Sequence, residues 1–261
     1  MPSHLAAAML AALEAMADSP QMQKVREVAD RALAPEPGQR ILDAGCGAGE
    51  VARHLAAGGA EVVALDYSAT NIAAAEERHD GSTVKYVTGD VAALDFPDDS
   101  FDGARSERVL QHLVDPDRAI AELRRVTRPG GRVCLIDTDW ETLVIEGPPP
   151  ELRDALRAHL YGRVMTHHRE IGRTLRGRLV RAGFADVTAE PVVLYFPDPV
   201  SAMAVLPMVN PHVPAEALLV PDDLRERWFA AVETSGKRGD FLAALVMWVV
   251  TGTVRRKGRM N

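Results

Sequence analysis

Apolar residues recur three or four positions apart over the first 34 residues, in two series that Pro20 separates. The series are Leu5, Met9, Leu13 and Met16, then Met22, Val25, Ala29 and Leu33. Such spacing places the apolar side chains of each series on one face of a helix. We therefore predict a helical N-terminal region over residues 1–36, which ends within the segment "APEPGQ".

Between residues 40 and 139, short apolar runs alternate with helical patterns. The predicted strands are residues 40–44, 61–66, 83–90, 101–106 and 132–139, the last preceded by a turn at "RPGG". The predicted helices are residues 50–59, 69–79 and 115–127. This βαβα order is typical of a doubly wound, mostly parallel sheet with helices on both faces. The fold class that we predict is therefore α/β.

The pattern changes after residue 146, where "EGPPPE" interrupts the chain. Helical stretches follow at 151–166 and 169–182, and an interrupted helical segment covers 198–237. Residues 184–196 read as a strand, and Pro191 within it favours the edge of a sheet. Residues 241–254 form a last apolar run, which predicts a strand with both faces covered.

Composition and charge narrow the classes of partner. The chain has 261 residues, of which 47% are hydrophobic and 26% are charged, as in ordinary globular proteins. Its net charge of −7 argues against nucleic acid, since proteins that bind it present a basic face. The basic tail "RRKGR" is too short to reverse this balance. We expect a small-molecule partner and no nucleic acid.

The cysteines and the N-terminus bear on location. Cys46 and Cys134 offer neither a disulfide framework nor a metal-ligand spacing, so we expect a reducing cytoplasm and no metal. The N-terminus lacks a positively charged start, which argues against a signal peptide. The longest apolar run, residues 241–252, is too short for a membrane-spanning helix, so we expect no membrane partner.

Three glycines stand at alternate positions between the first predicted strand and its helix, in "RILDAGCGAGEVARHLA". Gly45, Gly47 and Gly49 lack Cβ atoms and tolerate positive φ, so a ligand can lie against the backbone near the helix N-terminus. Nicotinamide dinucleotide enzymes use a related G-x-G-x-x-G spacing. The glycines alone leave open a nucleoside cofactor, a dinucleotide, or a tight turn without a ligand.

Acidic residues at the next two strand ends favour an adenosine ligand. Asp66 ends the second strand 21 residues after Gly45, where a carboxylate accepts hydrogen bonds from ribose hydroxyls. Tyr67 could lie flat on an adenine ring, or pack half-buried in the core. Asp90 ends the third strand, where it could accept from the adenine amino group beside the Val91 backbone.

The stretch from Arg40 to Asp139 resembles the class I S-adenosylmethionine-dependent methyltransferases, especially the small-molecule group that includes the ubiquinone and menaquinone C-methyltransferases. The motifs are "LDAGCGAG", "ALDYS", "GDVAALDFPDDSFD" and "RPGG", over about 100 residues. The resemblance implies a three-layer sandwich around a seven-stranded, mostly parallel sheet. In it, the 184–196 strand lies at an edge, and the last strand is inserted antiparallel beside it.

The resemblance also implies S-adenosylmethionine as cofactor and S-adenosylhomocysteine as product. The glycines would border the methionine portion, with Asp43 holding the loop and the amino group. Asp66 would take the ribose hydroxyls, and Ser106, at the end of the fourth strand, would contact the methionyl part. The cofactor-binding residues that follow are Asp43, Gly45, Cys46, Gly47, Gly49, Asp66, Tyr67, Asp90, Val91 and Ser106.

Methyl transfer from a sulfonium is an in-line displacement, for which the protein positions the nucleophile and excludes water. A base is optional. His112, in "VLQHL", is the candidate catalytic residue, and a satisfied core histidine is the alternative. His167 and His168 are further candidates, or a solvated pair.

Other polar residues are candidates for the substrate pocket. Asp137, Asp139 and Trp140 follow the fifth strand and should face the pocket mouth. Arginines that could hold an acidic substrate are Arg105, Arg108, Arg169 and Arg173, although arginines on helices are more often exposed. We expect a single domain with three parts: a lid (1–36), a cofactor-binding core (37–146), and a part that completes the sheet and covers the substrate (147–261).

The leading interpretation is methylation of a small organic molecule, with a role in specialised metabolism as an analogy. The absence of an N/D-P-P-Y tetrapeptide after the fourth strand argues against methylation of a nucleobase amino group. A nicotinamide-dependent oxidoreductase is one alternative. A cyclase or binding protein that does not methylate is another. The sequence leaves open the substrate, the atom methylated, and whether the protein is a monomer or a homodimer.

Overall fold

A computed structural model describes residues 16, 19–78, 81–162, 167–213 and 220–255 of the chain. The predicted helical series at Leu5, Met9 and Leu13 and the tail "RRKGR" from residue 256 onwards lie outside the described residues. The second series forms helix α2, Pro20–Leu33, and its four apolar side chains are all buried, as their spacing predicts.

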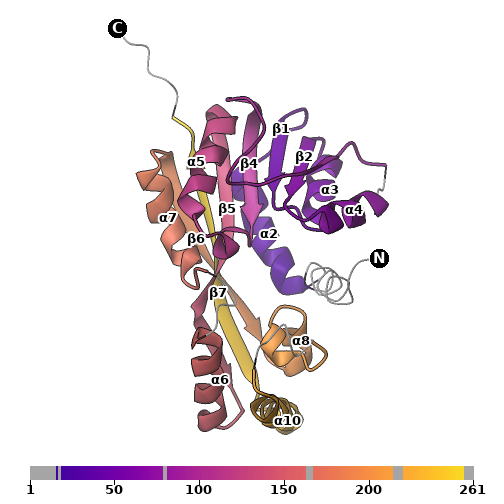
Figure 1. Cartoon of the computed structure of the whole chain (residues 1–261), viewed down its shortest axis with the longest axis vertical. Coiled ribbons are helices and arrows are strands. Elements are labelled where there is room, and N and C mark those ends of the chain that lie inside the picture. The colour runs from indigo at the N-terminus through magenta and orange to yellow at the C-terminus, as the bar shows by residue number, and fades with distance from the viewer. Residues whose placement is uncertain (1–15, 17–18, 79–80, 163–166, 214–219, 256–261) are drawn as a thin grey trace. The chain divides into compact units, whose positions relative to one another are not determined.

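Seven strands form one sheet in the order β3-β2-β1-β4-β5-β7-β6 (Figure 1). The strands are β1 Arg40–Ala44, β2 Glu61–Asp66, β3 Lys85–Thr88, β4 Phe101–Glu107, β5 Thr127–Glu146, β6 Ala185–Phe196 and β7 Leu242–Thr253. The first five pair in parallel. The edge position of β6 and the insertion of β7 between β5 and β6 confirm the predicted order.

Backbone hydrogen bonds show how β7 runs. The N–H of Gly130 donates to Val254 O at 2.8 Å, and the N–H of Val254 donates to Gly131 O at 2.9 Å. The end of β7 therefore meets the beginning of β5, which is the antiparallel direction predicted for the last strand. The sheet is mixed, and most of its pairs are parallel.

The segment "RPGG" is not a turn before the fifth strand, as predicted, but a bulge inside β5. Phe101 pairs with Thr127, whereas Gly103 pairs with Arg132, so two steps along β4 correspond to five along β5. Gly130 has a φ of 90°, which permits this bulge because glycine lacks a Cβ. The third predicted strand, residues 83–90, is shortened to Lys85–Thr88.

The helices largely follow the predicted segments. They are α3 Glu50–Ala57, α4 Ala69–Glu77, α5 Pro116–Val126, α6 Pro150–Gly162, α7 Ile171–Arg181, α8 Pro199–Met203 and α10 Asp222–Arg238, with 3₁₀ turns η1 Leu110–His112 and η2 Pro207–Val209. The Asp115 carboxylate caps α5 by accepting from the Arg118 N–H at 3.1 Å. Gly239, with a φ of 78°, ends α10.

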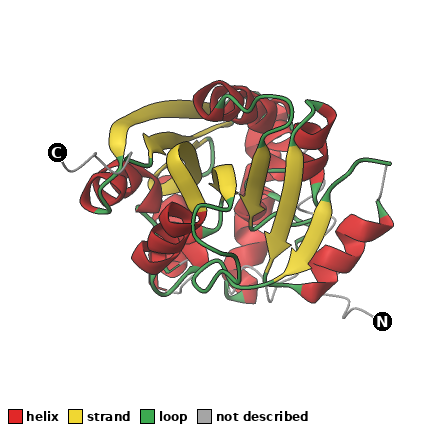
Figure 2. Cartoon of the chain, turned by 90° about the horizontal axis from the view of Figure 1, so that it is seen from above, coloured by secondary structure: helices red, strands yellow, loops and turns green. Residues whose placement is uncertain are grey.

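The chain divides into two compact units. The larger unit comprises Lys24–Asp139, His168–Val192 and Met247–Asn261. Within it, helices lie on both faces of the sheet (Figure 2). Gly103 faces Leu33 of α2, whereas its neighbour Ala104 belongs to a core with Leu123 of α5 and Leu175 of α7. Successive strand residues thus contact opposite helical layers.

The smaller unit comprises Met1–Gln23, Trp140–His167 and Val193–Val246. Its core is built around Trp228 of α10, which is 1% exposed and donates its indole N–H to Met208 O at 2.6 Å. Helix α10 packs against α6 and α8. The helical interruption predicted for 198–237 is present, because α8 and η2 are short and precede the long α10.

Candidate active site

The three glycines between β1 and α3 all have positive φ: 86° at Gly45, 55° at Gly47 and 77° at Gly49. Side chains are strained in this region, so the backbone conformation itself requires glycine. A Cβ on Gly45 would clash with Val109, and one on Gly49 would lie 2.7 Å from the Tyr86 ring. The glycines therefore shape the loop and also keep its surface free of side chains.

The end of β2 holds this loop in place. The N–H groups of Gly45 and Cys46 donate to Leu65 O at 2.6 and 2.9 Å. Asp66 accepts from the Gly47 N–H at 2.9 Å through Oδ2, and from the Ser68 N–H at 2.8 Å through Oδ1. The predicted ribose carboxylate therefore already fixes the glycine loop, a role that sequence spacing did not indicate.

Asp43, predicted to hold the loop, is 3% exposed near the end of β1. Burial raises the pKa of its carboxyl to about 6, because a charge is costly away from water, and the Arg105 guanidinium opposes this shift. Its Oδ2 has no hydrogen-bond partner among the described residues. Arg105 was a candidate for binding an acidic substrate, but it is 1% exposed and lies among carboxylates of the protein.

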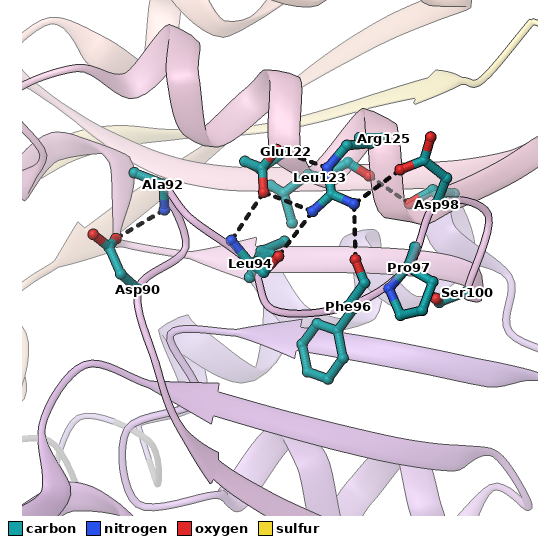
Figure 3. Close-up of polar contacts among 11 residues, drawn as sticks. Asp90, Ala92, Leu94, Phe96, Pro97, Asp98, Ser100, Glu122, Leu123 and Arg125 are labelled. Carbon is teal, nitrogen blue, oxygen red and sulfur yellow. Dashed lines mark hydrogen bonds and ion pairs between the residues drawn. The ribbon is translucent and has the colours of Figure 1, made fainter.

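The predicted adenine residues lie at the ends of β2 and β3. Tyr67 is 82% exposed, so the alternative of a half-buried core tyrosine is wrong. Asp90 is exposed and accepts from the Ala92 N–H at 2.8 Å (Figure 3). The Val91 side chain is buried and anchors the start of the loop that follows.

That loop is braced by two residues of α5, Glu122 and Arg125, which belong to none of the sequence motifs (Figure 3). Arg125 donates to Leu94 O at 2.8 Å and to Phe96 O at 2.7 Å. Glu122 accepts from the Leu94 N–H at 2.9 Å and from Arg125 at 2.7 and 2.8 Å. The only sequence signal was a charged pair three positions apart on a predicted helix.

Ser106 and Cys46 have internal contacts. Ser106 is fully buried, and its Oγ donates to Ala44 O at 2.8 Å, so it links the ends of β4 and β1. Burial raises the pKa of the Cys46 thiol well above its usual range, which keeps this cysteine protonated and a poor nucleophile.

His112, the candidate base, ends the short turn η1 and is exposed, so the alternative of a core histidine is wrong. Its Nε2 lies 3.1 Å from the Gln111 amide nitrogen. Asp137, fully buried, holds the turn by accepting from the Gln111 N–H at 3.1 Å. Burial raises the pKa of Asp137 to about 7.

The pocket-mouth prediction for Asp137 and Asp139 is wrong, because both carboxylates bind groups inside the protein. Asp139 is 1% exposed and pairs with Arg173 through two contacts of 2.5 and 2.7 Å. This pairing uses the Nε and one Nη of Arg173, whose side chain is 43% exposed. Trp140, in the smaller unit, is 9% exposed.

Of the remaining candidates, Arg108, His168 and Arg169 lie in the larger unit, and His167 lies in the smaller one. Arg108 adopts a φ of 57°, unusual for a residue with a side chain, and burial lowers its pKa. The His168 N–H donates to Gln111 O at 3.2 Å, so His168 contributes to the turn that carries His112. His167 is exposed, and Arg169 is partly buried.

Across the described ranges, no group of His, Cys, Asp and Glu side chains is placed to hold a metal ion. Within the same residues, no helix has both the length and the apolar character needed to cross a membrane.

Residues 42–135 match the family model described as "Methyltransferase domain". A malonyl-[acyl-carrier protein] O-methyltransferase from Pseudescherichia vulneris is 34% identical over 184 residues, 69% of each chain. A demethylmenaquinone methyltransferase from Clavibacter sepedonicus is 40% identical over 113 residues, 43% of this chain and 46% of that protein. The chain thus spans about half the length of this second relative.

Among solved structures, the fold is similar to that of phosphoethanolamine N-methyltransferase 2 from Haemonchus contortus in complex with S-adenosyl-L-methionine. The TM-score is 0.60 at 18% identity, over 95% of this chain and 57% of that one. At this identity the likeness concerns the fold alone.

Proposed function

The chain belongs to the class I S-adenosylmethionine-dependent methyltransferases, and from this membership we propose that it transfers the methyl group to a small organic molecule. Its cofactor is S-adenosylmethionine. The observation that carries the proposal is the glycine loop between β1 and α3, fixed by Asp66 and followed directly by a helix N-terminus.

The residues of this region fit the cofactor. The loop backbone is bare at three positions, so a ligand can approach it closely. Asp43 offers a buried oxygen without a partner in the described chain, which suits the ammonium of the methionyl group. Asp66 Oδ1 already accepts from the Ser68 N–H and the Asn71 amide, whereas Oδ2 accepts from the Gly47 N–H alone and keeps a lone pair for a ribose hydroxyl.

We assign the cofactor contacts as the sequence predicts them. The methionyl part would be held by Asp43, Gly45, Cys46, Gly47, Gly49 and Ser106, and the adenosine by Asp66, Tyr67, Asp90 and Val91. The Ser106 hydroxyl donates its hydrogen to Ala44 O, so towards the cofactor it would act as an acceptor.

When bound, S-adenosylmethionine supplies a methyl group that its sulfonium makes electrophilic. The chain then has to orient the acceptor and exclude water, which can supply much of the rate acceleration. We propose His112 as the residue that takes a proton from the acceptor. Two observations support this role. His112 is exposed on η1, and the buried Asp137 carboxylate holds this turn by accepting from the Gln111 N–H.

The acceptor is proposed as a small organic molecule of biosynthesis, and a role in specialised metabolism rests on analogy with the family. One relative is named for demethylmenaquinone and another for a malonyl group on an acyl-carrier protein. In both names, the group that is methylated is a small organic one. The acidic net charge also supports a partner other than nucleic acid. A cytoplasmic location and a monomeric or homodimeric state belong to the same proposal.

The test is a screen of acceptors. The protein is incubated with S-adenosylmethionine and panels of phenols, quinols, amines and carboxylic acids, and S-adenosylhomocysteine release is measured together with the mass of the product. Cofactor-dependent methylation of one class supports the proposal. A nicotinamide-dependent oxidoreductase has no support from the comparisons. Product formation without S-adenosylhomocysteine would instead favour a reaction that does not methylate.

A further inference from the structure

Five charged side chains meet where β1 and β4 end, within the larger unit. Arg105 Nη2 lies 2.5 Å from Glu107 Oε2, and Arg26 Nη2 lies 3.6 Å from the other oxygen of Glu107. Arg105 also lies 3.8 Å from Asp30 Oδ1 and 3.9 Å from Asp43 Oδ1. Helix α2 thus contributes one arginine and one aspartate to the ends of two strands.

The cluster concentrates charge around buried groups. Its two arginines face three carboxylates, and Arg108 adds a further positive charge that acts on Glu107. Arg105 and Asp43 are 1% and 3% exposed, and a buried charge is costly unless a partner compensates it. His54 of α3 lies 2.9 Å from Asp30, on the more exposed side of the cluster.

Buried polar atoms of the cluster that have no hydrogen-bond partner among the described residues include Arg105 Nε, Asp30 Oδ1 and Asp43 Oδ2. The separation of 3.9 Å between Arg105 and Asp43 is too long for a direct hydrogen bond. Arg105 therefore acts on Asp43 through its charge, and an oxygen of Asp43 stays available to an incoming donor.

We propose that Arg105 is a positioning residue for the cofactor, whose charge keeps the buried Asp43 carboxylate ionised so that it can bind the ammonium of S-adenosylmethionine. This inference rests on the proposed function, since it assigns the Asp43 carboxylate to that cofactor. Arg105 itself touches no cofactor atom in this scheme.

The groups that face Asp43 explain why Arg105 is needed. Burial raises the pKa of Asp43, and Arg105 is the strongest influence that lowers it. Glu107 of β4 and Asp66 of β2 raise the pKa, and Arg26 of α2 lowers it. The nearby thiols Cys46 and Cys134 stay neutral, because burial raises both of their pKa values. Without the charge at position 105, the pKa of Asp43 would therefore rise further.

The experiment is calorimetric titration of the full chain with S-adenosylmethionine from about pH 5 to about pH 9. The affinity of the wild type should fall below about pH 6, where Asp43 takes up a proton. It should also fall at the alkaline end, where the amino group of the ligand loses its proton.

We call the loss of affinity at low pH the acid limb of the profile. In Arg105→Met, the acid limb should move towards higher pH, so that affinity is roughly tenfold lower near neutral pH, and the loss at high pH should stay where it is. Arg105→Lys keeps the charge and should keep the wild-type limb. Asp43→Asn should bind weakly, with no acid limb. If circular dichroism shows that Arg105→Met is unfolded, Arg26→Gln replaces it, because Arg26 lies at the more exposed edge of the cluster. This variant should move the acid limb in the same direction, but by less.

A uniform loss of affinity in Arg105→Met, with the acid limb unmoved, would show a purely structural role and overturn the inference. So would an Arg105→Lys profile that matches that of Arg105→Met, or an unmoved limb in Arg26→Gln where that variant is the one measured. Failure of the wild type to bind S-adenosylmethionine at any pH would overturn the proposed function itself, which distinguishes the two failures.

Discussion

The brace on the loop after β3 gives a prediction whose size follows from the contacts in Figure 3. In Arg125→Met, the loop loses two charged hydrogen bonds to backbone carbonyls, those of Leu94 and Phe96. Each such bond contributes about 1.5–3 kcal/mol when buried. The side chain is 31% exposed, so we discount the sum to about 2–4 kcal/mol and count nothing for the exposed pair with Asp98.

The loop begins at Asp90 and Val91, which we assign to the adenine ring. If binding must then order a loosened loop at a cost of about 1.4 kcal/mol, the Kd of S-adenosylmethionine rises about tenfold. Urea unfolding and calorimetric titration measure the two effects. Arg124→Met is the matched control, because Arg124 is the exposed neighbour on the same helix. A loss of stability below about 0.5 kcal/mol in Arg125→Met, or an equal loss in the control, would refute the brace.

Four further substitutions test single contacts. Asp66→Ala should remove most of the affinity for S-adenosylmethionine in titration, because it would break both the proposed ribose contact and the bond to the loop N–H; unchanged affinity contradicts the assignment. Gly45→Ala should cost about 1–3 kcal/mol in urea unfolding, since its φ is 86° and a Cβ meets Val109. His112→Gln should lower kcat by about 10²–10⁴-fold once an acceptor is known, with cofactor affinity kept, and an unchanged kcat would exclude a base at this position. Asp137 has a folded pKa of about 7 against an ordinary 3.8, so the folded state holds the extra proton and wild-type stability should fall as pH rises from about 4 to about 7, by an amount on the order of 4 kcal/mol. Asp137→Asn should lack this part of the pH dependence, and a parallel pH dependence in both proteins would contradict it.

The fold was largely predictable because its signals are local. The spacing of apolar residues located α2 and the first two strands, and the helix predicted over residues 115–127 contains α5, Pro116–Val126. Pro191 indicated the edge strand, since proline cannot donate to a sheet ladder. The "RPGG" segment was misread as a turn, because a bulge and a turn use the same glycine conformations.

The candidate site was less predictable where partners are distant in sequence. An arginine in a strand is ordinarily exposed, and the burial of Arg105 depends on Asp30 of α2, which tertiary packing alone brings near. Asp137 has the same sequence signal as a pocket carboxylate, yet it turns to the backbone of η1. Short-range spacing made Asp66 a candidate cofactor residue, whereas its bond to the Gly47 N–H became visible only in the folded loop.

The most direct test of the central claim is calorimetric titration of the full chain with S-adenosylmethionine, S-adenosylhomocysteine and, separately, NAD. We predict binding of the first two, with S-adenosylhomocysteine the tighter, and no binding of NAD. Binding of NAD alone would contradict the proposed site, and each residue assigned to the cofactor would need another role.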